Sequence, residues 1–206
     1  MKVLYCAGEQ ARVVLDVLDR CDDAETVVLV DDDPATHGTR VAGRRVVGGA
    51  DSLAELDAGE LRCLVAFGKP GPTRIDITRR LQDDGYALFS AVDPTAVLST
   101  TATVGEGVTV NAGSYVGPGA SLGDAVLVDS VVAVSHDVTL GPGATVTPNS
   151  TLAGGVTVGR GAYVGAGATV VDHTSVGENA VVGAGAVVVD DVPPGETVVG
   201  VPAEPV

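Results

Sequence analysis

The sequence predicts an α/β N-terminal domain of the Rossmann kind followed by a left-handed parallel β-helix. The second half of the chain repeats an apolar residue at every sixth position, and the first half alternates short apolar strands with helical segments. The two patterns meet near residue 90. We therefore expect two domains, residues 1–90 and residues 91–206, each large enough to bury its own core.

The β-helix is predicted by the strict period of six. A helix spaces its apolar residues by three and four and a pleated strand spaces them by two, so this period fits neither. Six residues form one flat side of a triangular coil, and the residue four places after each anchor is small or β-branched, as a narrow interior requires. The anchors, all valine or leucine, are Val92, Leu98, Val104, Val110, Val116, Leu122, Val128, Val134, Leu140, Val146, Leu152, Val158, Val164, Val170, Val176, Val182 and Val188.

The N-terminal half predicts strands and helices in alternation, which is typical of a parallel sheet with crossover helices. Ligands of such sheets bind beyond the carboxyl ends of the strands. These ends are the Cys6–Ala11 turn, Asp31–Asp32 and Gly68–Lys69. The expected strands are residues 2–7, 26–34 and 61–68, and the expected helices are residues 8–21, a short one at 51–57 capped by Asp51, and 72–85.

The first turn offers one glycine, Gly8, where a dinucleotide fingerprint needs three. The N–H groups at the start of the following helix can still hold a phosphate, so a ligand-binding turn and a structural turn both remain open. Asp31 and Asp32 have the same two interpretations. They are suited to hydrogen bonds with a ribose or a uracil, and they also suit a solvated turn.

His136 and Asp137 interrupt a repeat built mainly from valine, glycine, alanine and threonine. A neutral imidazole backed by a carboxylate is a suitable general base near pH 7, whereas most lone surface histidines are inert. His173 lies two coils further along the axis, about 10 Å away at strand spacing. A zinc site with three histidine ligands needs one histidine more than the two of the repeat domain, so we expect no metal.

The composition excludes some partners. The net charge is −15, from 27 acidic and 12 basic residues, which disfavours nucleic acid and anionic membranes as partners. Aspartate is abundant and lysine is scarce, since the sequence contains only Lys2 and Lys69. This composition indicates either a halophilic protein or an ordinary acidic one. Cys6, Cys21 and Cys63 form no CxxC motif, and no signal peptide or long apolar run is visible, so a cytoplasmic protein with reduced thiols is expected.

The whole chain resembles the NeuD/PglD-type sugar acetyltransferases, a family of sialic-acid O-acetyltransferases and UDP-4-amino-sugar N-acetyltransferases. The residues that carry the resemblance are YCAGEQARVVLDVL, VDDDP, VAFG, VDPTAV, VSHDVTLG, TLAGGVTVGRGAYVGAGATV, GENAVVGAGAVVVDDVPPG and GVPA. It implies an acetyl-CoA-dependent enzyme of surface-glycan synthesis that forms a homotrimer, with each active site between neighbouring β-helices.

The resemblance also implies roles for individual residues. His136 would take a proton from the acceptor amine or hydroxyl, and Asp137 would orient the imidazole. Acetyl-CoA would contact Thr145, Ala166 and Ala184. The sugar or nucleotide sugar would contact Gly8, Glu9, Gln10, Asp31, Asp32 and Gly68.

Two alternatives remain open from the sequence. One is an acetyltransferase for another small acceptor, such as an amino acid, because Glu9 places a negative charge where a pyrophosphate would lie. The other is a non-catalytic trimeric scaffold that binds sugar, against which the His136–Asp137 pair argues.

Overall fold

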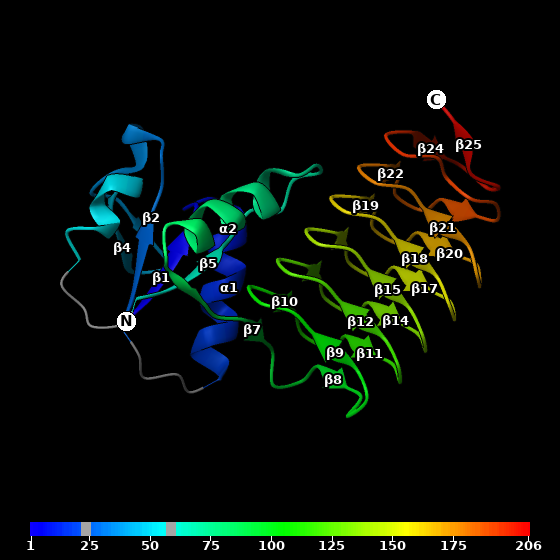
Figure 1. Ribbon diagram of the computed structural model, residues 1–206, viewed down its shortest axis with the longest axis horizontal. Helices are drawn as coiled ribbons and strands as arrows, with labels where there is room; N and C mark the ends of the chain where they lie inside the picture. The colour runs from blue at the N-terminus through cyan, green and yellow to red at the C-terminus, as the bar shows by residue number, and fades with distance from the viewer. Residues whose placement is uncertain (22–25, 57–60) are drawn as a thin grey trace.

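The computed structural model describes residues 1–21, 26–56 and 61–206. A parallel sheet with helices on both faces is followed by a stack of triangular coils that extends away from it (Figure 1). The predicted fold class, an α/β domain followed by a β-helix, is therefore confirmed.

The N-terminal sheet has the strand order β3-β4-β2-β1-β5-β6. All neighbouring strands run parallel except β3, which is antiparallel to β4. The strands are β1 (Lys2–Tyr5), β2 (Val27–Val30), β3 (Arg40–Val41), β4 (Arg44–Gly48), β5 (Arg62–Val65) and β6 (Ala87–Leu88).

The two α-helices cover opposite faces of this sheet, because successive strand residues point to opposite sides. Leu4 of β1 packs with the apolar stripe of α1 (Glu9–Arg20), whereas Val3 and Tyr5 pack in a cluster that contains Leu81 of α2 (Thr73–Asp83). The sheet therefore has a core on each side.

Several expected boundaries differ from the observed ones. The first strand ends at Tyr5 because Cys6 has a positive φ of 75°, and the third expected strand ends at Val65, before Gly68. The short helix expected at 51–57 is a 3-10 helix, η2 (Ala50–Leu53), with Gly49 rather than Asp51 at its N-cap position. The remainder of that expected helix reaches residue 57, outside the described residues. A further 3-10 helix, η1 (Pro34–Thr36), follows β2.

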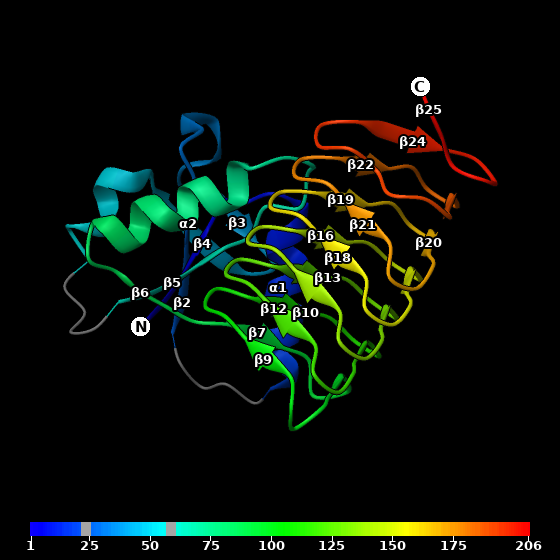
Figure 2. The same ribbon diagram turned by 45° about the vertical axis from the view of Figure 1, so that its right-hand side comes forward.

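The β-helix has three flat faces of short parallel strands, to which β25 adds an antiparallel strand at the end of the first face (Figure 2). The first face contains β7 (Ala91–Val92), β10 (Thr109–Val110), β13 (Leu127–Val128), β16 (Thr145–Val146), β19 (Tyr163–Val164), β22 (Val181–Val182) and β24 (Thr197–Val199). The second contains β8 (Val97–Leu98), β11 (Tyr115–Val116), β14 (Ala133–Val134), β17 (Thr151–Leu152), β20 (Thr169–Val170) and β23 (Val187–Val188). The third contains β9 (Thr103–Val104), β12 (Ser121–Leu122), β15 (Thr139–Leu140), β18 (Thr157–Val158) and β21 (Ser175–Val176).

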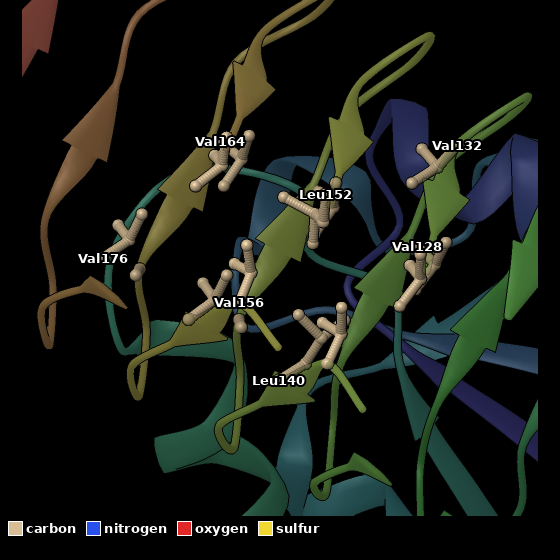
Figure 3. Packing of buried hydrophobic residues seen from close by; sticks show 14 of the residues in the cluster. Val128, Val132, Leu140, Leu152, Val156, Val164 and Val176 are labelled. Carbon is tan, nitrogen blue, oxygen red and sulfur yellow. The ribbon is translucent and has the colours of Figure 1, made fainter. Parts of the chain in front are cut away.

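The predicted anchors fill the interior of the coils (Figure 3). Each is the second residue of its strand, and from Val110 onward all are buried. The residues four places later, such as Val156 and Ala162, are buried beside them. In the first coil Val104 remains 38% exposed, because no coil lies beneath it.

The last coil is shorter than the others. Equivalent residues of earlier coils are 18 apart in sequence, as in the bond from Asn111 Nδ2 to Asp129 Oδ1, but the amide of Ser175 donates to Asp191 Oδ1, 16 residues away. The chain then turns back as β25 (Glu204–Pro205), which pairs antiparallel with β24. The stack of parallel strands on the first face ends there.

The interior position of the anchors predicts how substitutions affect stability. Leu140→Ala should lower the free energy of unfolding by about 2–5 kcal/mol, because Leu140 is 1% exposed and its removal leaves a cavity. Thr139→Ala on the same strand is the matched control and should change it by about 0.5 kcal/mol or less, since Thr139 faces solvent. Guanidinium unfolding measures both, and equal losses would contradict the assignment of faces.

Candidate active site

A pocket of about 690 Å³ lies at the carboxyl edge of the N-terminal sheet, where β1, β2 and β5 end. Its lining residues are Cys6, Gly8, Glu9, Gln10, Asp31, Ala66, Phe67, Gly68 and Lys69. The structure thus brings together five of the six residues to which the family resemblance gives an acceptor-binding role. Asp32 lines a second, smaller pocket instead, with His37 and Ser52.

Gln10 and Gly68 form one side of the larger pocket. A Cβ atom at residue 68 would lie 3.2 Å from Gln10 Oε1, so glycine lets the Gln10 side chain pack against this backbone. The Gln10 Nε2 atom is buried and has no hydrogen-bond partner among the described residues. A buried amide nitrogen without a partner is a donor for a ligand oxygen.

Asp31 connects the pocket's turns to one another. Its Oδ2 atom accepts a 2.6 Å hydrogen bond from the Ala7 amide, and its Oδ1 atom accepts one of 2.9 Å from the Asp33 amide. Because a carboxylate has about four acceptor sites, Asp31 retains capacity for a ligand while it holds the first turn against the end of β2.

Asp32 is part of a three-residue cluster beside the pocket. The Tyr5 hydroxyl donates to Asp32 Oδ2 at 2.6 Å, and Arg80 of α2 donates to the Tyr5 oxygen and lies 3.6 Å from Asp32. The hydrogen bond from Tyr5 lowers the pKa of Asp32, and burial together with that bond raises the pKa of Tyr5. The cluster therefore remains a neutral phenol beside an ionised carboxylate.

His136 and Asp137 lie at the corner between the second and third faces, formed by residues 135–138, 153–156 and 171–174 and called here the histidine corner. Nδ1 of His136 is 3.0 Å from Oδ2 of Asp137. Both side chains are exposed, at 64% and 72%. The contact leaves Nε2 of the imidazole directed away from Asp137.

Gly154 and Gly155 occupy the next coil of the histidine corner, and sequence reasoning did not select them. A Cβ atom at residue 154 would lie 2.5 Å from Nε2 of His136, and one at residue 155 would lie 2.5 Å from Nδ1 of His173. The two imidazoles therefore flank one pair of glycines, although their backbones are two coils apart. The signal was available in the repeat, since residue 154 stands one coil after His136.

Ala166 and Ala184 are exposed and stacked in successive coils, with the Gly185 amide donating to the Ala166 carbonyl at 2.8 Å. They lie at the corner between the first and second faces, formed by residues 147–150, 165–168 and 183–186 and called here the alanine corner. Thr145 is apart from them. It is 2% exposed, and its hydroxyl accepts a 2.8 Å hydrogen bond from Arg74 of α2.

The N-terminal domain packs against the third corner, formed by residues 123–126, 141–144 and 159–162 and called here the docking corner. Arg74 donates to the Gly143 carbonyl there at 2.9 Å, and Arg160 pairs with Asp76 of α2. In one chain the pocket, the histidines and the two alanines are thus associated with different corners.

Within the described ranges, no group of three histidine, cysteine, aspartate or glutamate residues is arranged to hold a metal ion. No helix in the same part of the chain has the length and apolar character needed to cross a membrane.

Comparisons with known proteins identify the family. Residues 3–81 match the PglD N-terminal domain, and residues 155–190 match the bacterial transferase hexapeptide. PerB from Caulobacter crescentus, solved in complex with CoA and GDP-perosamine, is 38% identical, with a TM-score of 0.92 over 100% of this chain and 96% of that one. The chain belongs to the PglD/NeuD-type sugar acetyltransferase family. Like other members of this family, it is an acyltransferase.

A second member of the family is similarly close. The acetyltransferase domain of PglB from Neisseria gonorrhoeae is 32% identical, with a TM-score of 0.92 over 100% of this chain and 98% of that domain. The same domain has been solved in complex with acetyl coenzyme A, with a TM-score of 0.82 and 31% identity over the same shares. No curated protein sequence matches the chain.

The pocket predicts low reactivity for Cys6. Burial and the charges of Asp31 and Asp32 raise the pKa of its thiol to about 12, so the reactive thiolate is scarce at pH 8. Alkylation by iodoacetamide should be on the order of 10³-fold slower in the folded chain than in guanidinium chloride. Mass spectrometry of the Cys6 peptide measures this, with the exposed Cys21 as the internal control. Equal rates in the two states would contradict it.

Proposed function

We propose that this chain transfers the acetyl group of acetyl-CoA to the amino group of a nucleotide-linked sugar. The observation that carries the proposal is its similarity to PerB, solved with CoA and GDP-perosamine, over 100% of this chain and 96% of that one, in a chain that also has the pocket and the His136–Asp137 pair. An amine acceptor is favoured over a hydroxyl because a mutant of GDP-perosamine N-acetyl transferase from Caulobacter crescentus is 37% identical to this chain.

His136 is the general base in this proposal. Asp137 accepts a hydrogen bond from Nδ1–H of His136, which leaves Nε2 unprotonated and able to take a proton from the acceptor amine as the nitrogen attacks the thioester carbonyl. The tetrahedral intermediate then expels the CoA thiolate, which takes the proton back from the imidazolium. The products are the amide and free CoA, and no covalent enzyme intermediate is needed.

The Gly154 amide is suited to stabilise the oxyanion. None of the described residues accepts a hydrogen bond from this N–H, and residue 154 packs directly against the His136 ring. A preorganised backbone donor beside the base stabilises the negative charge that develops on the thioester oxygen. Glycine is required because a side chain here would displace the imidazole.

Acetyl-CoA would lie along the alanine corner, where Ala166 and Ala184 leave the backbone accessible. Thr145, which the family resemblance also assigned to CoA, is not proposed, because its hydroxyl is buried against Arg74. The nucleotide sugar would occupy the pocket of the N-terminal sheet, with Gln10 and the first amides of α1 directed to the phosphates.

The active site would form between copies in a homotrimer. One chain places the pocket, the His136–Asp137 pair and the two alanines at different corners, so a neighbouring copy is needed to complete the site. The second face exposes apolar side chains suited to such contacts, with Val97 59% and Tyr115 44% exposed.

A different small acceptor, such as an amino acid, is the alternative that Glu9 favours. This carboxylate lines the pocket and would repel a pyrophosphate, whereas it would attract an ammonium group. If the protein is cytoplasmic and halophilic, concentrated salt would weaken the repulsion between Glu9 and a pyrophosphate, because the Debye length shortens to about 3 Å at 1 M.

The proposed base predicts the effect of its removal. His136→Ala should lower kcat for acetyl transfer by about 10²–10⁴, since proton transfer by a positioned base contributes that factor. Thiol release from acetyl-CoA with GDP- and UDP-linked amino sugars measures it. His173→Ala is the matched control, because His173 lies at the same corner, and it should change kcat less than threefold. An unchanged rate in the folded His136→Ala variant would eliminate this base.

The trimer predicts a salt-dependent assembly. Sedimentation in about 1 M KCl should give three 20.5 kDa chains per particle, and dilution to about 0.1 M KCl should release monomers. The reason is that each chain carries a net charge of −15, which is less screened when the Debye length grows to about 10 Å. A monomer at high salt would refute the trimer, and a trimer that is indifferent to salt would refute the halophilic interpretation.

A further inference from the structure

Arg74, near the start of α2, is a buried cation whose contacts come from both domains. Its residue is 3% exposed, and it has no carboxylate partner among the described residues. Burial lowers its pKa to about 10, so it remains charged at neutral pH. A buried charge without a counterion requires an unusually complete set of hydrogen-bond acceptors.

Those acceptors belong to two successive coils of the β-helix and to the pocket. Nε donates to the Ala125 carbonyl at 2.7 Å, and Nη2 donates to the carbonyls of Gly143 at 2.9 Å and Ala144 at 3.0 Å. Nη1 donates in the other direction, to the Phe67 carbonyl at 2.6 Å. One rigid guanidinium therefore joins the docking corner to a residue that lines the pocket.

The segment that Arg74 holds forms one wall of the pocket. Ala66, Phe67, Gly68 and Lys69 follow β5 and all line it. Gly68 also contacts the Gln10 side chain on the opposite turn. A shift of the Phe67 peptide would therefore move both the wall and the surface against which Gln10 packs.

We propose that Arg74 is a positioning residue for the acceptor, which fixes the Ala66–Lys69 wall to the β-helix and thereby sets the affinity for the nucleotide. This inference rests on the proposed function, because it assigns the pocket to the nucleotide part of the acceptor. Arg74 acts through the Phe67 carbonyl and touches no reactant. Its loss should raise KM for the acceptor and leave KM for acetyl-CoA unchanged.

Arg160 provides the matched control. It also joins the β-helix to α2, through Asp76, and it contacts Glu178 at 3.6 Å, but no residue of the pocket is among its partners. Arg160→Met thus removes a contact between the domains without releasing the wall.

The test is calorimetric titration of GDP and of UDP into the 206-residue chain, together with measurement of KM for both substrates and of amide exchange in residues 66–69. Arg74→Met should lower the affinity for the nucleotide that the native chain binds by about tenfold. This is within the range seen for residues that influence a ligand without touching it. It should also speed exchange in the wall, whereas Arg160→Met should change affinity less than twofold. Arg74→Lys keeps the charge but loses the planar fork, so it should show the same effect if the methionine variant does not fold.

Three outcomes overturn the inference. Folded Arg74 variants that bind the nucleotide as the native chain does would eliminate the positioning role. An equal loss in Arg160→Met would show that domain contact in general, rather than the wall, sets affinity. A native chain that binds neither GDP nor UDP would refute the nucleotide acceptor itself, and this inference with it.

Discussion

The hydrogen bonds between successive coils are the constraint on which the rest of the molecule depends. The Thr145 amide donates to Ala162 and the Leu127 amide to Ala144, each at 2.9 Å, and this pattern recurs around the coils. Because equivalent residues are 18 apart, every outward position becomes a column of stacked residues. A side chain that leans along its column needs a small residue in the next coil. Glycine at position 154 meets that need for His136.

The same regular spacing creates the surface against which the N-terminal domain packs. At the docking corner, Gly143 has a φ of 72°, and a Cβ there would lie 2.8 Å from Ile75 of α2. The helix consequently approaches close enough for Arg74 to reach carbonyl groups of two coils. At this corner the side chain of Arg74 binds backbone carbonyl groups of the β-helix, and the Arg160–Asp76 ion pair adds a contact between side chains.

The sequence predicts the β-helix well because each anchor has a single function, to fill the interior. It also predicts the pocket residues Gly8, Gln10 and Gly68, since the carboxyl ends of parallel strands converge. It does not predict the short strands β3 and β4, in which Arg44 and Arg45 obscure any apolar pattern. The sequence does not predict the roles of Gly154 and Arg74 either. Their importance arises from neighbours that are distant in sequence, and a lone arginine on a helix usually faces solvent.

The shortened last coil has a consequence for the solubility of the chain. A regular β-helix presents, at its end, a row of unpaired backbone groups that invites another molecule to continue the stack into a fibre. Here the last coil is shorter than the one before it, since Val181 pairs with Thr197, and β25 pairs antiparallel with the outer edge of β24, with Glu204 exposed. A second molecule would therefore find no free edge of β24 on this face. The antiparallel strand β25 thus disfavours the addition of another parallel strand on this face.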